Sequence, residues 1–155
     1  MTHNQKHHIH KWSPDLSVGI PIIDDDHKGF FEVVNHISAM IDSGSIELDD
    51  LNIQLLTLED YVVGHFNREE KFLSKGPRAE YLHHKHLHDQ FRQEVKELVA
   101  RCRAKDEEAV RALPDVVSNW IVQHIRKVDA KYESWVSLDH VDDRPLGMLL
   151  HKRAY

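Results

Sequence analysis

The sequence contains little cysteine, glycine or proline, and each scarcity narrows the class of protein. Cys102 is the only cysteine among 155 residues, which excludes a disulfide framework and a cysteine-based zinc or iron–sulfur site. The six glycines and five prolines fall mostly between stretches of regular hydrophobic spacing. Stretches that alternate apolar and polar residues are also missing, so a β-sheet is not expected.

Long hydrophobic runs and an excess of positive charge are lacking too. No stretch reaches the roughly 18 consecutive apolar residues of a membrane helix, and residues 1–11 hold no apolar signal-peptide core. The 20 Lys and Arg against 26 Asp and Glu give a net charge of −6, which argues against nucleic acid or an anionic membrane as partner. We therefore expect a cytoplasmic protein of a single domain, 1–155, with no membrane insertion.

Apolar side chains that recur at intervals of three and four residues predict helices over about 22–41, 48–73 and 79–102. A fourth helix is expected to end near Trp135. Its start depends on Pro114, which either lies in the first turn or kinks a helix that began near Asp106. Short connections between these segments favour an all-α fold, an antiparallel up-down four-helix bundle.

Two segments flank the predicted bundle, whose core spans about 12–135. Residues 12–21 are expected to form an extended N-terminal arm, because Ser, Pro and Gly interrupt the helical spacing there. Residues 136–155 form a C-terminal extension. A loosely docked tail is the simpler expectation for it, although the apolar run 145–150 could pack on the bundle or on a partner protein.

Histidine is abundant instead, with 14 in the chain, and imidazole is the commonest metal-binding side chain. Polar residues interrupt the apolar stripes at positions that the spacing assigns to the core: His27, His65, Glu69, His84, His88 and His124, with Asp129 about 140° round the helix from His124, near the edge of that face. Without partners, each buried polar group would cost roughly 1–3 kcal/mol. A net stability of about 5–15 kcal/mol cannot absorb that sum, so a shared ligand is expected.

The same residues are expected at one height in the bundle. They come early in the first and third helices and late in the second and fourth. In antiparallel helices with a rise of about 1.5 Å per residue, that order places them in a slab of roughly 10 Å. Five imidazoles and two carboxylates exceed the capacity of one tetrahedral ion, so the sequence predicts two metal ions. Imidazole suits iron, copper, zinc and nickel, and carboxylates can bridge two ions.

The other nine histidines are expected to be solvated and to bind no metal. His36, His83 and His86 lie on helices but point away from the stripes. The rest lie outside the predicted helices: His3, His7, His8, His10, His140 and His151.

Several motifs together resemble the hemerythrin family in its bacterial form, over about Trp12 to Trp135. They are the arm and first-helix pattern around Trp12, Leu16–Ile20, Ile23, Asp24 and His27, His65-Phe66-x-x-Glu69-Glu70, His84-x3-His88-x2-Phe91, and Trp120-x3-His124-x4-Asp129-x2-Tyr132. One position departs from the family pattern: Asp26, beside the first histidine of the set, stands where many relatives carry Gln, so its hydrogen bonding is expected to differ.

The resemblance implies reversible O2 binding at a non-haem centre of two iron ions, which cycle between Fe2+ and Fe3+. It implies that His84, His88 and His124 hold one iron, and that His27 and His65 hold the other and leave a position open. Glu69 and Asp129 would bridge the pair with an oxo or hydroxo group. Trp120, Ile121, Ile125 and Phe31, or Phe30 in place of Phe31, would form a dry O2 pocket. The resemblance implies a carrier, store or sensing component, not an enzyme, with no catalytic residues.

Three other interpretations stay open at the level of sequence. A di-iron enzyme acting on peroxide or nitric oxide is one, although oxidative di-iron bundles use Glu-x-x-His pairs that are absent from this ligand set. An iron- or zinc-handling protein with a His-rich N-terminus is another. A purely structural bundle is the third, and the buried polar layer argues against it. The oligomeric state and any protein partner are not predicted.

Overall fold

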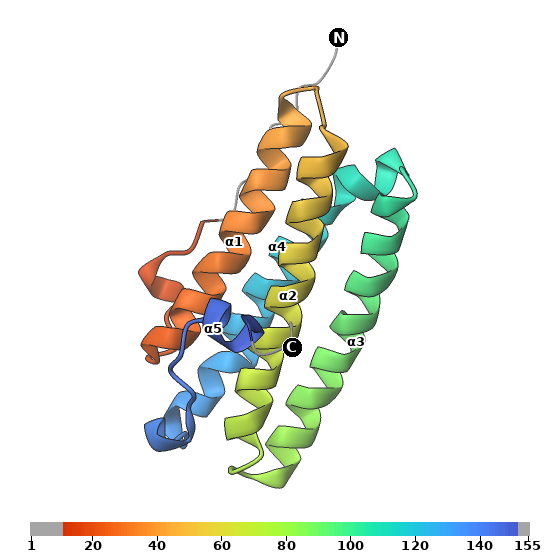
Figure 1. The fold of residues 1–155 in the computed structure, drawn as a ribbon. Helices are drawn as coiled ribbons and strands as arrows, with labels where there is room; N and C mark the ends of the chain where they lie inside the picture. The colour runs from red at the N-terminus through yellow and green to blue at the C-terminus, as the bar shows by residue number, and fades with distance from the viewer. Residues whose placement is uncertain (1–10, 152–155) are drawn as a thin grey trace.

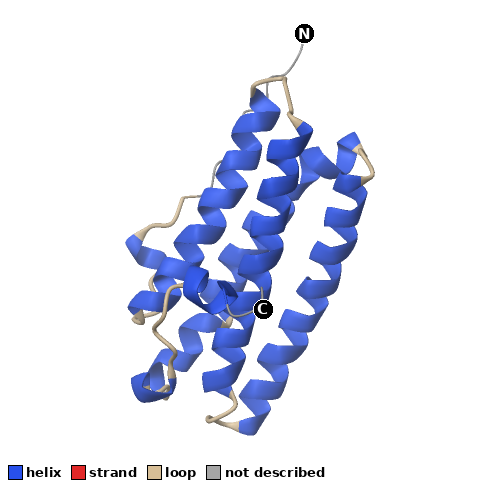
Figure 2. Cartoon of the chain, viewed as in Figure 1, coloured by secondary structure: helices blue, strands red, loops and turns tan. Residues whose placement is uncertain are grey.

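A computed structural model of the protein describes residues 11–151, without the side chains of Leu150 and His151. Its long helices are α1 (Pro21–Asp42), α2 (Leu48–Leu73), α3 (Arg78–Arg103) and α4 (Glu107–Lys127) (Figure 1). Every regular element among the described residues is helical (Figure 2). α1 and α3 each pack against both α2 and α4, and short loops reverse the chain between successive helices. The predicted antiparallel four-helix bundle is confirmed.

The fourth helix begins at Glu107, which settles the question that Pro114 raised. The Asp106 carboxylate caps this helix by accepting a hydrogen bond from the backbone N–H of Ala109 at 3.2 Å. Pro114 therefore lies inside α4. The prediction that the helix continues to Trp135 is wrong. Val128, with φ −121° and ψ −59°, leaves the helical conformation, and the chain continues as the 3-10 helix η2 (Asp129–Ser134).

The N-terminal arm is tied to the start of α1 and is not extended throughout. It contains a 3-10 turn, η1 (Pro14–Leu16), that packs against α4. The buried carboxylate of Asp24 accepts hydrogen bonds from the Val18 N–H at 3.0 Å and the Ser17 hydroxyl at 2.6 Å. Leu16 and Val18 are buried, so the arm contributes to the hydrophobic core.

The C-terminal extension packs on the bundle up to the end of the described residues. It forms the 3-10 helix η3 (Leu138–His140) and the short helix α5 (Leu146–His151), which lies against α2 (Figure 1). Leu146 is buried, and Arg68 of α2 donates hydrogen bonds to two carbonyl oxygens of the extension. The expectation of a loosely docked tail is therefore wrong for 136–151, because specific contacts hold this segment. Residues 152–155 lie outside the described part.

No helix within residues 11–151 combines the length and the apolar character needed to cross a membrane.

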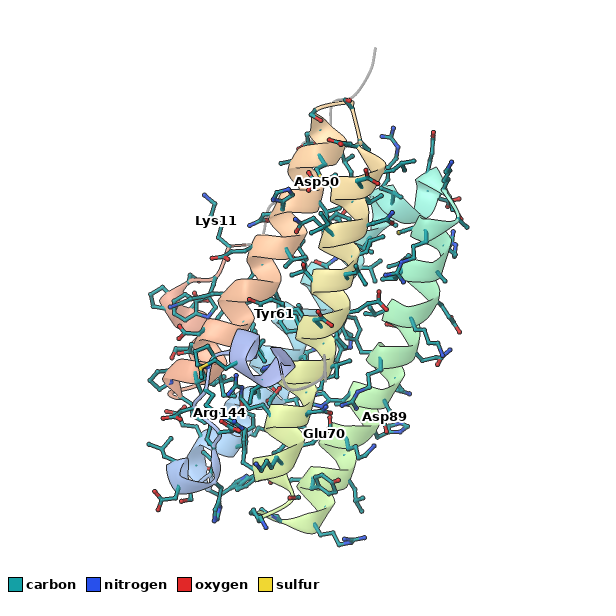
Figure 3. The ribbon with its side chains drawn as sticks, viewed as in Figure 1. Lys11, Asp50, Tyr61, Glu70, Asp89 and Arg144 are labelled. Carbon is teal, nitrogen blue, oxygen red and sulfur yellow. The ribbon has the colours of Figure 1, made fainter. Side chains whose placement is uncertain are left out.

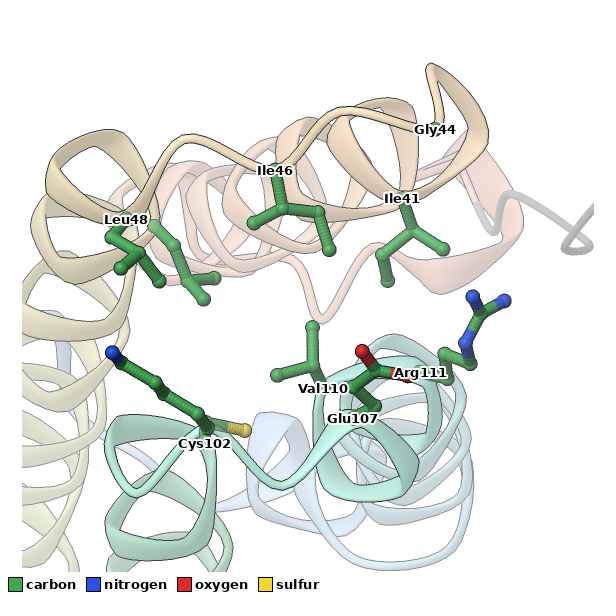
Figure 4. Close-up of a pocket in the computed structure, with 10 residues that line it drawn as sticks. Ile41, Gly44, Ile46, Leu48, Cys102, Glu107, Val110 and Arg111 are labelled. Atoms are coloured by element: carbon green, nitrogen blue, oxygen red, sulfur yellow. The ribbon is translucent and has the colours of Figure 1, made fainter.

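A cavity of about 370 Å³ opens between the loops at the end of the bundle where α1 joins α2 and α3 joins α4 (Figure 4). It is lined by Ile41, Ile46, Leu48, Val110 and others. None of the predicted site residues lines this cavity.

Candidate metal centre

The structure brings together all seven predicted metal ligands in the bundle core. α1 contributes one histidine, α2 a histidine and a carboxylate, α3 two histidines, α4 one histidine and η2 a carboxylate: His27, His65, Glu69, His84, His88, His124 and Asp129. Each of these residues is buried, and Glu69, His88 and Asp129 have no exposed surface. Their ligand atoms form two sets, within each of which all atoms lie within 4.8 Å of one another: Glu69, His84, His88 and His124, and His27, His65, Glu69 and Asp129.

Three imidazoles converge on one side of this cluster. The Nε2 atom of His124 lies 3.0 Å from Nε2 of His84 and 3.2 Å from Nε2 of His88. One proton between two nitrogens can turn either contact into a hydrogen bond. The three nitrogens, however, point at the same region and compete for that proton. A single metal ion accepts lone pairs from all three, which makes this a candidate site for the first ion.

The two carboxylates lie between the three-histidine set and the remaining two histidines. Asp129 places Oδ1 2.9 Å from Nε2 of His84, and Oδ2 3.3 Å from Nε2 of His27. Glu69 places Oε1 2.6 Å from Nε2 of His65 and Oε2 3.7 Å from Nε2 of His84. Asp129 therefore presents one oxygen to each side, and Glu69 lies between His65 on one side and His84 and His88 on the other, as bridging ligands between two metal ions would.

The break between α4 and η2 explains why Asp129 lies inside the cluster. On a continuous helix, Asp129 would lie about 140° round from His124, at the edge of the buried face. Because Val128 leaves the helical conformation, the carboxylate of Asp129 turns inward and becomes fully buried.

Unpaired polar atoms indicate that protein groups alone do not satisfy this cluster. Both oxygens of Glu69, both oxygens of Asp129 and Nε2 of His27 are buried and have no hydrogen bond of acceptable geometry. A buried polar group without a partner costs about 1–3 kcal/mol, and a charged one more. Imidazole nitrogens with bridging carboxylates are a donor set for iron, zinc or copper, so the residues present fit a centre of two such ions.

The protonation states in the metal-free protein also favour a cation. For Asp129, burial opposes ionisation, but His124 and the nearby imidazoles of His27 and His84 hold the pKa well below its usual value. Burial also opposes the charged form of His65. The Glu69 carboxylate and the contact with Asp26 nevertheless raise the pKa of His65 to about 10. Burial lowers the pKa of His88 well below its usual value. In the metal-free protein, protons therefore occupy part of the space that a bound metal ion would take.

Hydrogen bonds on the outer side of two imidazoles fix their orientation. Nδ1 of His65 lies 2.8 Å from Oδ2 of Asp26, and Nδ1 of His88 lies 3.0 Å from Oε2 of Glu70. Glu70 lies on α2 facing α3, as Figure 3 shows. Each outer carboxylate favours the tautomer with a proton on Nδ1 and a free lone pair on Nε2, which is the atom that points into the cluster.

A small apolar cavity adjoins the two-histidine side. Its volume is about 10 Å³, and its polar lining residues are His27, His65, His124 and Asp129. Its apolar wall contains Trp120, Ile121 and Ile125, which were predicted for the pocket, Phe30, which was predicted as the alternative to Phe31, and Phe66, which was not predicted.

Phe31 is not among the lining residues of this cavity, although it is buried. Its neighbour Phe30 takes that place, because successive residues of a helix point about 100° apart.

Two residues near the cluster were not predicted as site residues. Phe66 stacks on the His88 imidazole, with ring centroids 3.8 Å apart. Tyr132 is buried beside His84, and burial together with the charges of Glu69 and Asp129 raises its pKa well above the usual value. Both residues belong to the motifs that surround the ligands, which is the signal that could have identified them.

The remaining histidines are distributed as expected where the structure describes them. His36, His83, His86 and His140 are exposed. His3, His7, His8 and His10 lie outside the described residues, as does the side chain of His151.

The fold and the site define a class: an antiparallel four-helix bundle whose core carries two overlapping sets of histidine and carboxylate metal ligands. Comparison with known protein families identifies the family within this class. The family model described as "Hemerythrin HHE cation binding domain" matches residues 18–136. The chain belongs to the hemerythrin family.

Individual relatives agree with this assignment. The chain is 31% identical to the bacteriohemerythrin of Methylococcus capsulatus over 118 residues, which cover 76% of this chain and 88% of that protein. It is also 31% identical to the bacteriohemerythrin of Pseudomonas aeruginosa over 122 residues, covering 78% of this chain and 77% of that protein. A crystal structure of wild-type hemerythrin superposes with a TM-score of 0.68 at 28% identity, covering 81% of this chain and 96% of the other.

Proposed function

We propose that the protein binds O2 reversibly at a non-haem di-iron centre formed by the seven buried ligands. The observation that carries this function is the pair of overlapping ligand sets with a small apolar cavity against one of them. Membership in the hemerythrin family supports the same function.

The two ligand sets predict unlike roles for the two iron ions. His84, His88 and His124 would hold one ion, His27 and His65 the other, and Glu69 and Asp129 would bridge them together with an oxo or hydroxo group. The second ion has one histidine fewer, and both of its histidines line the cavity. When bound, the irons would supply electrons and an open coordination position for O2.

The surrounding side chains exclude water and restrict the size of the ligand. A cavity of about 10 Å³ is at the lower limit for a single water molecule, so it admits only a very small molecule. Trp120, Ile121, Ile125, Phe30 and Phe66 form its apolar wall. These side chains offer no proton donor to a bound ligand except the Trp120 indole, and they disfavour the departure of a charged species.

The balance of ligands favours binding over oxidative catalysis. Five histidines and two carboxylates make up the sets, whereas oxidative di-iron bundles are richer in carboxylates. We expect a carrier, store or sensing component in the cytoplasm, with no turnover of peroxide or nitric oxide beyond that of free iron.

Metal analysis combined with visible spectroscopy tests this function. We expect about two irons per chain, a visible absorption band in the air-exposed protein, and a nearly colourless sample after anaerobic reduction. The band should return when O2 is added and vanish when O2 is removed. Fewer than about two irons in well-loaded protein, or a spectrum unaffected by O2, would contradict the proposal. Rapid turnover of peroxide or nitric oxide would instead favour the alternative that the protein is a di-iron enzyme.

A further inference from the structure

Arg68 is a charged residue of α2 that is almost completely buried, with 3% of its surface exposed. It lies between His65 and Glu69 in sequence, yet its guanidinium forms its hydrogen bonds with Asp26 and with the C-terminal extension. Its Nε donates to Oδ2 of Asp26 at 2.8 Å, and its Nη2 lies 3.3 Å from Oδ1 of the same carboxylate. A buried guanidinium is tolerated only when its charge is paired and its N–H groups are hydrogen-bonded. The ion pair with Asp26 meets the first of these two conditions.

The C-terminal extension meets the second condition by accepting hydrogen bonds from the remaining N–H groups of the guanidinium. Arg68 donates through Nη1 to the carbonyl oxygen of Asp142 and through Nη2 to the carbonyl oxygen of Arg144 at 2.7 Å. The Asp142 side chain holds this turn by accepting from the N–H and Nε of Arg144 at 3.2 and 2.9 Å. Figure 3 shows Arg144 at about the level of Glu70 in the bundle, which is the level of the candidate metal centre.

Asp26 connects this arrangement to a metal ligand. Its Oδ2 atom contacts both Nε of Arg68 and Nδ1 of His65, each at 2.8 Å. The carbonyl groups of the extension, Arg68, Asp26 and the His65 imidazole thus form one continuous chain of hydrogen bonds. Such outer partners orient a ligating imidazole and strengthen its donor nitrogen.

The three-histidine set has a different kind of support. Nδ1 of His88 contacts Glu70, which pairs with Arg92 of α3. The Arg92 side chain is 26% exposed and also pairs with Asp89 on its own helix. Every hydrogen-bond partner of Arg92 in the described part of the chain lies on α2 or α3. Within the described residues, therefore, the side-chain hydrogen bonds from the helices to the extension come from Arg68 on the His65 side.

We propose that the C-terminal extension, residues 136–151, positions His65 through Arg68 and Asp26, and thereby strengthens metal binding at the two-histidine set alone. This inference rests on the proposed function, because it assumes a metal at that set. Arg68 is a positioning residue in this arrangement, and the docked extension is part of the support for one iron of the pair.

Amide hydrogen exchange of the metal-free, full-length protein tests the contact without any metal. Arg68→Met removes the donors, so amides of residues 136–151 should exchange at least about tenfold faster. Arg68→Lys keeps the charge but cannot reach the Asp26 carboxylate and both carbonyl oxygens at once. Its exchange rate in residues 136–151 should therefore lie between those of the wild type and Arg68→Met. Arg92→Met is the matched control on the other set and should leave this segment unchanged. Unchanged exchange in Arg68→Met would overturn the inference, whatever the iron content.

Iron release to a chelator tests the consequence for the metal. In Arg68→Met, one of the two irons should leave about tenfold faster, as expected for loss of an outer hydrogen-bond partner, and the Mössbauer signal of one site should fall first. Asp142→Ala should have the same effect in a smaller degree, since it loosens the turn without altering the core; the adjacent exposed Asp143→Ala is its control. Equal acceleration of both irons, or of neither, would overturn the inference. A wild-type protein without iron would instead contradict the proposed function, while the exchange experiment would still report on the contact.

Discussion

The ring of Phe66 lies flat against the imidazole of His88, with centroids 3.8 Å apart and planes inclined by 3°. The same side chain lines the cavity beside His27 and His65. Phe66 therefore contacts both candidate metal sets, one through stacking and the other through the cavity wall.

Replacing Phe66 with Leu should leave iron bound but shorten the life of the O2-bound state. The smaller side chain opens the apolar wall to water, and the stability cost of such a truncation in the core is on the order of 1–3 kcal/mol. We expect the O2-dependent absorption band to decay about tenfold faster in air because the hydrophobic shell controls solvent access. Phe91→Leu is the control: Phe91 is equally buried and stacks on Trp120 but does not line the cavity. Equal decay in both variants would contradict a specific role for Phe66.

His84→Ala should strip iron from the protein. His84 contacts Asp129 at 2.9 Å and His124 at 3.0 Å, so its loss removes a ligand at the junction of the two sets. Iron content should fall from about two per chain to one or fewer, measured by elemental analysis after anaerobic loading. The adjacent His83 is exposed, and His83→Ala should retain both irons. Loss of iron in His83→Ala would refute the assignment of ligands by helix face.

The buried cluster of candidate ligands could be predicted from sequence because local geometry determines where these side chains lie. A residue's face and height on a helix follow from 3.6 residues per turn and a rise of 1.5 Å, and these alone placed His65, Glu69, His84 and His88 in one layer. The bounds of α2 match the expected 48–73 for the same reason.

Other features depend on contacts between distant segments, which spacing cannot reveal. Asp129 reaches the centre only because the helix stops at Lys127. Arg68 has the sequence context of a solvated charge, but it is buried because carbonyl groups 74 and 76 residues further along the chain accept its hydrogen bonds. The apolar run 145–150 left packing on the bundle open as one outcome, but the hydrogen bonds with Arg68 that hold the extension could not be predicted from its hydrophobicity.

Replacing Asp24 with Ala should detach the N-terminal arm. The buried carboxylate accepts from the Val18 N–H and the Ser17 hydroxyl, and a hydrogen bond to a charged group contributes about 1.5–3 kcal/mol. We expect the free energy of unfolding to fall by about 2–3 kcal/mol, measured by urea denaturation, and the arm to be cleaved faster by protease. Asp25→Ala, at the exposed neighbouring position, is the control. A stability loss as large in that control would show that helix-terminal charge, and not the arm contact, is responsible.

The stability of the metal-free protein should decrease as pH rises from neutral to alkaline. Burial disfavours the His65 cation, but Glu69 and Asp26 raise its pKa from 6.5 to about 10 in the folded state. The protonated form therefore stabilises the fold fully below about pH 6.5, and this contribution is lost as pH rises through about 10. A tenfold difference in proton affinity between the folded and unfolded states corresponds to about 1.4 kcal/mol, so the loss is on the order of a few kcal/mol.

The variant His65→Gln removes this titration while its amide can still bond Asp26. Its urea midpoint should change less between pH 6.5 and 10 than that of the wild type, whereas His36→Gln, at an exposed site, should follow the wild type. A wild-type midpoint that rises with pH, or identical slopes in His65→Gln and wild type, would show that the His65 proton is not held by the two carboxylates. In the iron-loaded protein the dependence should disappear, because a metal ion at Nε2 replaces the proton there.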